Sequence, residues 1–192
     1  KPASTPPNHA ERARGAEEGN AASRGVSARA TNQVQGHYYL GMNLGQLADP
    51  KRNLTALKLV KEMEREFEAA RKADELFDYA GPDRNLGLLY LQAPTLFSIG
   101  DRAQAREHLQ RAVELAPDFP ANRLEMIEAC LKWGERKEAL NELKALEDVW
   151  LEAHRKFAGE SWAADWVQWD RRLEAARRKL GQTNKSPAAP KR

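Results

Sequence analysis

The side chains that could carry out chemistry are few in this sequence and lie far apart. The four histidines show no zinc-type spacing with the cysteine or with one another: His9, His37, His108 and His154. The single cysteine, Cys130, lies in an apolar stretch beside Leu131, where a thiol usually packs as a small hydrophobic group. The sequence has neither a Gly-rich phosphate loop nor a Gly-x-Ser-x-Gly nucleophile motif. We therefore predict that the protein is not an enzyme and uses no cofactor and no metal.

Four carboxylates gather shortly before the middle of the chain: Asp74, Glu75, Asp78 and Asp83. A group of carboxylates could hold a metal ion, but ordinary surface charge at the end of a helix explains them more simply. We therefore predict a solvated helix end at these residues.

Basic and acidic residues nearly balance, with 31 Lys and Arg against 28 Asp and Glu and a net charge of +3. The basic excess gathers toward the C-terminus: Arg171, Arg172, Arg177, Arg178, Lys179, Lys185, Lys191 and Arg192. A solvated helix face followed by a tail is the favoured interpretation, and contact with nucleic acid or an acidic surface is the alternative. No apolar run approaches the roughly 18 residues of a membrane span, so no transmembrane helix is predicted.

Helical periodicity dominates the stretch 81–134. Asp101 and Gln104 have the spacing of a capping box. Apolar residues then follow at helical steps: Ala105, Leu109, Ala112 and Leu115. Pro117 is expected to end this helix, and Pro120 suits the first turn of the next one. Small side chains that would let paired helices approach closely are Ala105, Ala112 and Ala139.

Four further helices are predicted around this stretch, over residues 32–48, 53–77, 136–157 and 161–181. In the first of them, Gly41 and Gly45 indicate that another backbone comes close. Gly81–Pro82 is expected to end the second helix, and Ser161 to cap the last one. The last helix carries an aromatic stripe: Trp162, Trp166 and Trp169. We favour a terminal helix that buries this stripe, with a partner-binding aromatic surface as the alternative.

The central stretch resembles the tetratricopeptide repeat, a pair of antiparallel helices with a period of about 34 residues. One copy runs over residues 86–119 and matches the pattern at Leu89, Gly100, Ala105, Leu109, Ala112 and Pro117. A second copy starts at Pro120 and matches it at Cys130, Gly134, Ala139, Leu143 and Leu146. In the second copy, Leu146 stands where the pattern has alanine and Leu151 where it has proline. Pro94 interrupts the first helix of the earlier copy.

The resemblance implies an all-α fold, a right-handed α-solenoid of stacked antiparallel helix hairpins that ends in a C-terminal capping helix. We expect a helical-repeat domain over residues 11–181, with tails at 1–10 and 182–192. Its expected hairpins span about 11–77, 84–116 and 120–157, and the capping helix spans 161–181. The segment 11–30 would be the remnant helix of a degenerate repeat.

The resemblance also implies a non-catalytic scaffold that binds a peptide or a partner protein on the concave face formed by the first helices of successive repeats. Matching positions on that face are Tyr38, Met42, Gln46, Tyr90, Phe97, Leu124, Glu128, Leu131 and Lys132. The segment 81–94 is similar to a bacterial subgroup of these proteins that is exported or associated with TRAP-type solute transporters. The alternative is therefore a periplasmic accessory component of solute transport, in which the break at residues 91–95 opens a small-molecule or solute-receptor site.

Overall fold

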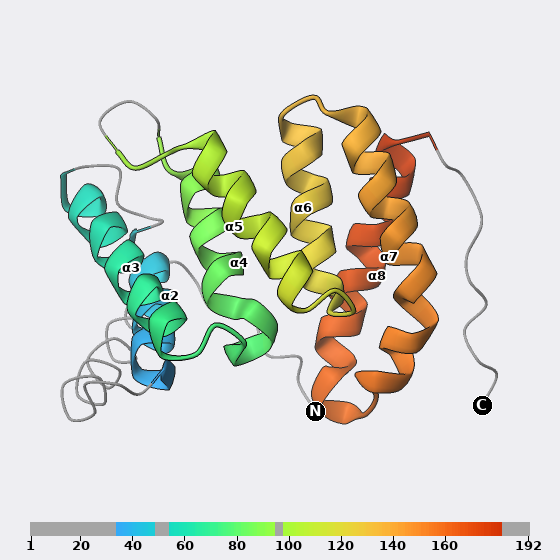
Figure 1. Ribbon diagram of the computed structural model, residues 1–192, viewed down its shortest axis with the longest axis horizontal. Coiled ribbons are helices and arrows are strands. Elements are labelled where there is room, and N and C mark those ends of the chain that lie inside the picture. The colour runs from blue at the N-terminus through green and yellow to red at the C-terminus, as the bar shows by residue number, and fades with distance from the viewer. Residues whose placement is uncertain (1–33, 49–53, 95–97, 182–192) are drawn as a thin grey trace, which may run out of the picture. The chain divides into compact units, whose positions relative to one another are not determined.

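The chain forms seven α-helices and one short 3₁₀ helix over the residues that the computed structural model describes, 34–48, 54–94 and 98–181. The helices are α2 Val34–Ala48, α3 Leu54–Ala73, α4 Phe77–Gln92, α5 Arg102–Leu115, α6 Pro120–Lys132, α7 Arg136–Lys156, η1 Glu160–Trp162 and α8 Ala163–Lys179 (Figure 1). No strand occurs within these ranges. The predicted all-α helical-repeat fold is confirmed. The predictions for residues 1–33, for Phe97 and for the tail 182–192 lie outside the described residues.

The chain divides into two compact units, residues 1–105 and 106–192, and the division falls inside α5. In the first unit, α3 packs against both α2 and α4. The core of this unit is formed by buried side chains from all three helices: Tyr38, Phe67, Ala70, Leu86 and Leu89. In the second unit, α6 pairs with α7, and α8 packs against both of them. Helices α3, α7 and α8 turn an apolar stripe toward their neighbours and a charged face toward water, whereas α2 carries no Lys, Arg, Asp or Glu.

The helix starts and ends follow the local sequence in most places. The Asp101 carboxylate accepts hydrogen bonds from the backbone N–H groups of Ala103, at 2.7 Å, and Gln104, at 3.0 Å, so the predicted cap of α5 is confirmed. Pro120 is the first residue of α6, as predicted. The predicted cap at Ser161 is wrong, because Ser161 lies inside η1 and Trp162 precedes α8 without a capping side chain.

The predicted boundary at Gly81–Pro82 is also displaced. Helix α3 ends earlier, at Ala73, where the Asp74 carboxylate accepts a hydrogen bond from the N–H of Leu76. Gly81 and Pro82 lie near the start of α4, directly after three residues with left-handed backbone angles, 78–80. Pro82 is tolerated there because the first turn of a helix has no partner for its missing N–H.

The neighbour that leaves no room for a side chain at Gly41 is an aromatic ring. The sequence-based expectation of a close backbone is therefore wrong at this position. A Cβ atom on Gly41 would lie 2.6 Å from Cε1 of Phe67, whose ring is fully packed in the core. A Cβ atom on Gly45 would lie 3.1 Å from the terminal methyl of Met63, which can rotate away. The two glycines of α2 are therefore under different constraints.

We expect Gly41→Ala and Gly45→Ala to change stability in opposite directions. Gly41→Ala forces the Phe67 ring to move and should lower the free energy of unfolding by about 1–3 kcal/mol. Gly45→Ala should raise it by up to about 1 kcal/mol, since alanine is the better helix former. Urea unfolding followed by circular dichroism measures both. Equal effects of the two substitutions would contradict the ring contact at Gly41.

Candidate protein-binding surface

In the first unit, the candidate residues of the concave face lie in three different environments. Tyr38 is buried, with 4% of its surface exposed, and its ring packs edge-on against Phe67 and Phe77. Met42 and Gln46 are exposed, on the face of α2 opposite its buried leucines. Tyr90 is half-buried on α4. Of these four, only Met42 and Gln46 present their side chains to an incoming partner.

The Tyr38 hydroxyl lies at the centre of a partly buried polar network. It donates a hydrogen bond to the Asp78 carboxylate at 2.5 Å and accepts one from the Asn85 amide at 3.0 Å. Arg84 donates to the same carboxylate at 2.7 Å and to the carbonyls of Asp78 and Tyr79, each at 3.2 Å. Burial, with Asp78 adding to it, raises the pKa of Tyr38, so the hydroxyl keeps its proton and donates it.

This network explains how three consecutive non-glycine residues keep left-handed angles. Asp78, Tyr79 and Ala80 have φ values of 50°, 55° and 61°. Such angles cost roughly 1–2 kcal/mol per residue, so they persist only where other contacts hold them. The solvated helix end predicted for the acidic cluster is confirmed at Asp74, which is exposed directly after α3, and is wrong at Asp83, which is fully buried. Asp78 is exposed in part and is bound by Tyr38 and Arg84. Among the described residues, no group of His, Cys, Asp and Glu side chains has the arrangement of a metal site.

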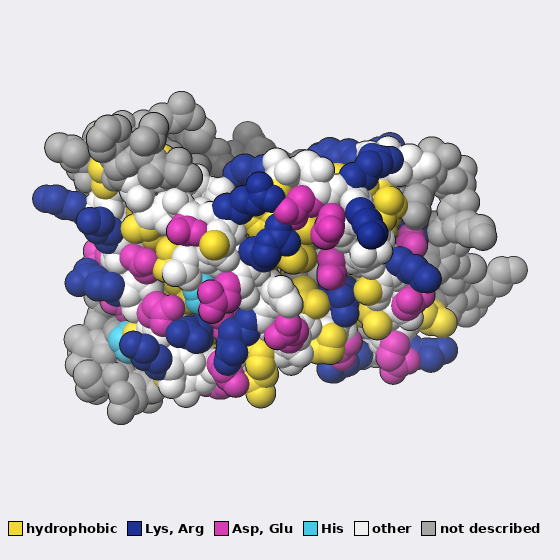
Figure 2. Space-filling model, turned by 45° about the horizontal axis from the view of Figure 1, so that its top comes forward, with side chains coloured by type: hydrophobic (Ala, Val, Ile, Leu, Met, Phe, Trp, Pro, Cys, Tyr) yellow, Lys and Arg dark blue, Asp and Glu magenta, His cyan; other side chains and the backbone are white. Residues whose placement is uncertain are grey.

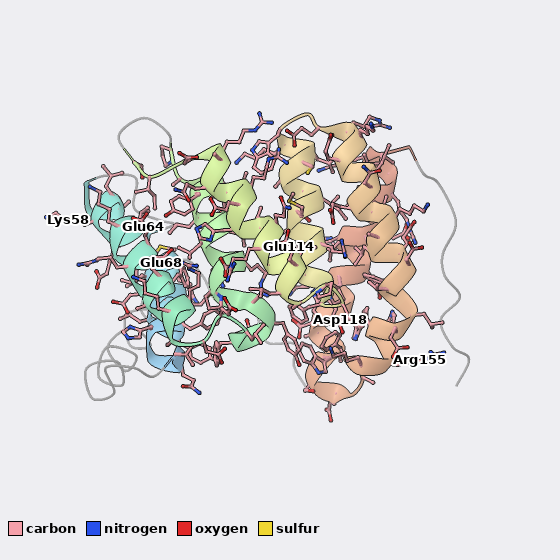
Figure 3. All side chains as sticks on the ribbon, viewed as in Figure 1. Lys58, Glu64, Glu68, Glu114, Asp118 and Arg155 are labelled. Carbon is pink, nitrogen blue, oxygen red and sulfur yellow. The ribbon has the colours of Figure 1, made fainter. Side chains whose placement is uncertain are left out.

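Tyr90 is held by α3. Its hydroxyl donates a hydrogen bond to the Glu64 carboxylate at 2.6 Å, and burial together with Glu64 raises the pKa of Tyr90. Glu64 and Glu68, labelled in Figure 3, lie one turn apart on α3, and Glu68 also binds Arg71 at 3.0 Å. The Tyr90 ring therefore ties α4 to α3, and its hydroxyl is already engaged.

In the second unit, the candidate residues of α6 lie around its contact with α8. Leu124 is fully buried, Leu131 is half-buried, and Glu128 and Lys132 are exposed. Arg172 of α8 crosses to α6 and binds the carboxylates of Glu125 and Glu128, each at 2.7 Å. We call the surface formed by Glu128, Leu131, Lys132 and Arg172 the α6–α8 face.

The contact with Glu125 and Glu128 stabilises the charged form of Arg172. Partial burial opposes the charge, but the hydrogen bonds and attraction of Glu128 and Glu125 outweigh it, so the pKa of Arg172 is raised. The guanidinium, with its fixed fork of N–H donors, holds two carboxylates one helical turn apart in a defined position. The α6–α8 face thus has a rigid charged centre beside a partly exposed leucine.

A buried amide on α6 was not anticipated from the sequence. Asn122 is fully buried, and its Nδ2 donates to the carbonyls of Ala112, at 2.9 Å, and Ala116, at 3.2 Å. These carbonyls belong to the last turn of α5, where helix geometry leaves them without backbone partners. The one sign of it in the sequence is a polar residue two positions after Pro120, on a helix whose other buried residues are mostly apolar.

The aromatic stripe of α8 packs where α7 and α8 meet. We call the cluster of Phe119, Phe157, Trp166 and Trp169 the aromatic joint. Trp169 is buried and meets Phe119, Phe157 and Trp166 edge-on, at ring-centroid distances of 5.4, 6.3 and 4.9 Å. Trp166 donates a hydrogen bond from Nε1 to the Phe157 carbonyl at 2.7 Å. These contacts support the packing interpretation of the stripe. Cys130 is also buried, and burial raises the pKa of its thiol to about 11, so it stays protonated near neutral pH.

We expect His154 to make the stability of this joint depend on pH. Its ring stacks on Trp166 with 3.5 Å between centroids and 10° between planes. Burial lowers the pKa of His154, and attraction to Asp170 offsets this only in part. Because the folded state binds the proton less well than the unfolded chain, stability is complete above the ordinary histidine pKa and is lost as the pH falls below it.

We therefore expect His154→Gln to flatten the dependence of stability on pH. Urea unfolding of the parent protein between pH 7.5 and pH 5 should show a falling free energy of unfolding, and part of that fall should disappear in the variant. An unchanged slope in His154→Gln would show that His154 is not the group responsible.

The comparisons with known proteins agree with this helical pattern. Residues 96–149 match the tetratricopeptide repeat family model, and the matched segment ends within α7 after covering α5 and α6. No curated protein matches the chain. None of the described helices combines the length and apolar character needed to cross a bilayer. The chain thus contains, within residues 96–149, a helical segment similar to the tetratricopeptide repeat.

Proposed function

We propose that the protein is a non-catalytic scaffold that binds a partner protein or peptide, and that the α6–α8 face contacts the partner. Tetratricopeptide repeats generally mediate protein–protein interaction, and α6 lies inside the segment similar to them. The first helices of such repeats line the binding surface of the stacked array. As the first helix of the second repeat copy, α6 is therefore expected to contribute to the binding surface.

The observation that carries the proposal is the composition of the α6–α8 face. The partly exposed Leu131 lies one turn from the exposed Glu128 and next to the exposed Lys132 in sequence, and Arg172 is fixed by Glu125 and Glu128. An apolar anchor with a surrounding rim of charges is the usual composition of a binding hot spot. Pre-positioning by ion pairs also reduces the side-chain entropy that is lost on binding.

Two of the candidate residues, Tyr38 and Leu124, are buried and do not present a surface to a partner. Polar substitutions at Leu124 or Tyr38 would damage the core, so they cannot separate binding from folding. Leu131→Asn and Lys132→Glu alter only half-buried or exposed positions of the α6–α8 face.

A photo-crosslinking amino acid placed at Lys132 tests the proposal directly. In an extract of the source organism, it should capture a defined protein, and capture should fall in a variant that also carries Leu131→Asn. The matched control places the same amino acid at Arg155, an exposed position farther along α7. Capture of the same proteins from Arg155, or capture unaffected by Leu131→Asn, would refute the α6–α8 face as the contact. The transport-accessory alternative and an exported or periplasmic location stay sequence-based predictions.

A further inference from the structure

Five exposed cations lie where α6, α7 and α8 meet at one end of the second unit. They are Lys132, Arg136, Lys137, Arg178 and Lys179, and we call them the basic end. Figure 2 shows Lys and Arg side chains gathered over this part of the surface, with a smaller number of acidic ones between them. The sequence alone favours a solvated helix face for the cations of α8, because it does not show that those of α6 and α7 lie beside them.

Specific contacts bring these cations together. Arg136, at the start of α7, donates from Nη1 to the Lys179 carbonyl at 3.0 Å and from Nη2 to the Leu180 carbonyl at 2.7 Å. Gly134, with a φ of 77°, makes the tight turn that places the end of α6 beside the start of α7. The last turns of α6 and α8 and the first turn of α7 therefore share one surface.

The acidic residue nearest to this turn is already engaged. Glu135 lies between Lys132 and Arg136 in sequence, and its carboxylate forms an ion pair with Arg106. Hydrogen bonding and attraction to Glu135 raise the pKa of Arg106 even though burial opposes its charge. The Arg106 guanidinium also lies over the Trp133 ring, 4.6 Å from its centroid. Glu135 is thus neutralised from the α5 side and does not offset the charge of the basic end.

Helix stability does not account for all five cations. Lys132, Arg178 and Lys179 lie in last turns, where the helix dipole favours positive charge. Arg136 and Lys137 occupy the first turn of α7, where the dipole disfavours it. Arg136 is explained by its hydrogen bonds to the end of α8, whereas Lys137 is exposed and its position is not explained in this way. A position that opposes local stability often serves another purpose.

We infer that the basic end is a docking surface for an acidic segment of a partner protein. Residues 106–181 contain nearly equal numbers of acidic and basic side chains, so the basic end is a local separation of charge and not a general excess. Opposite potentials across an interface steer encounter and select the partner. Lys132 belongs to both surfaces, but Arg136, Lys137, Arg178 and Lys179 lie outside the α6–α8 face, so the inference can be tested without changing that face.

The near balance of acidic and basic side chains in residues 106–181 favours an acidic peptide over a nucleic acid as the ligand of the basic end. Phosphate-backbone binding relies on a broadly basic surface that neutralises many regularly spaced phosphates. Glu138 lies in the first turn of α7 within the basic end and would repel a continuous polyanion. A peptide can place its carboxylates on either side of Glu138.

The test measures binding of a fluorescein-labelled decapeptide of alternating Glu and Ser to the full chain by fluorescence anisotropy. We expect saturable binding that weakens as the salt concentration rises. The double substitution Lys137→Glu with Arg178→Glu should weaken binding about tenfold, because it replaces two attractions by two repulsions. The milder double substitution, Lys137→Gln with Arg178→Gln, should weaken binding less. If the charge-reversal variant does not fold, the dissociation constant of this milder variant tests the inference.

The matched control reverses two exposed cations farther along α7, Lys144→Glu with Arg155→Glu. These lie about 10 and 27 Å from Lys137 along the helix axis, given a rise of about 1.5 Å per residue. Arg155 is labelled in Figure 3. The control should change the dissociation constant less than about twofold. Circular dichroism checks that every variant is folded.

Four outcomes would overturn the inference. Equal losses in the test and control variants would indicate non-specific charge attraction. Tighter binding of a ten-nucleotide RNA than of the peptide would indicate nucleic acid. Self-association of the parent chain that the Lys137 and Arg178 reversals abolish would indicate a second copy as the occupant. Undetectable peptide binding at low salt would remove the proposed partner class altogether.

Discussion

Replacing Arg84 by Met should lower the free energy of unfolding by about 3 kcal/mol. Arg84 binds the Asp78 carboxylate and the carbonyls of Asp78 and Tyr79, and it is itself buried. Removing one partner of a buried ion pair costs about 3–5 kcal/mol, and the lower end applies because the Asp78 side chain is 39% exposed. Methionine keeps the apolar stem of arginine, so most of the loss reports the guanidinium contacts.

The matched control for Arg84→Met is Arg71→Met. Arg71 pairs with Glu68 on the same helix, and both side chains are partly exposed, so its loss should cost at most about 1 kcal/mol. Urea unfolding followed by circular dichroism gives both values. Similar losses in the two variants would mean that the left-handed turn does not depend on Arg84. Tyr38→Phe should fall between them, at about 1–2 kcal/mol, since it removes one buried hydroxyl from the network.

The second large effect is expected for Trp169→Ala, with a loss of about 3–5 kcal/mol. The substitution removes a buried indole that contacts the rings of Phe119, Phe157 and Trp162 from three other segments, and the ring of Trp166 on the same helix. The cavity would lie between α7 and α8, where neighbouring aromatic rings are too large to fill it by small movements.

Val167→Ala provides the control for Trp169→Ala on the same helix. Val167 is 71% exposed, so its truncation should change the free energy of unfolding by less than about 0.5 kcal/mol. Thermal unfolding and hydrogen exchange of α7 and α8 amides should both distinguish the two variants. If Trp169→Ala left the protection of these amides unchanged, the aromatic joint would not hold α8 in place.

Much of the fold could be predicted because it depends on residues close in sequence. Asp101 caps α5 through N–H groups two and three residues away, and Pro120 starts α6 by its own fixed backbone angle. The buried stripe of α7 at Leu143, Leu146 and Trp150 follows from helical spacing alone.

The left-handed turn could not be predicted in this way. None of the residues 78–80 is glycine, and only Asp78 is of a type that occasionally adopts such angles, so Tyr79 and Ala80 are not expected to do so. Their conformation depends on Tyr38, which lies 40 residues before Asp78 in the sequence. A tertiary contact here overrides the local preference, and no pattern within one helix reveals it.

The candidate site could be predicted only in part, for a related reason. Spacing places Leu124 and Leu131 on one side of α6, but whether a side chain there is buried depends on what packs beside it. Helix α8 packs against α6, and Leu124 is fully buried whereas Leu131 stays half-exposed. Arg172 and Glu128 lie 44 residues apart in the sequence. Because the chain has many charged residues, the sequence does not show which of them pair over such a distance.

The separation of tryptophans and tyrosines between the two units has a practical consequence for spectroscopy. All five tryptophans of the chain lie between residues 133 and 169, within the second unit, and all four tyrosines lie between residues 38 and 90, within the first. Excitation at the red edge of the absorption band selects indole emission, so it reports on the second unit alone. Phenol absorbance reports mainly on the first. The native sequence thus carries a separate optical label on each half, and their melting curves can be recorded from one unmodified sample.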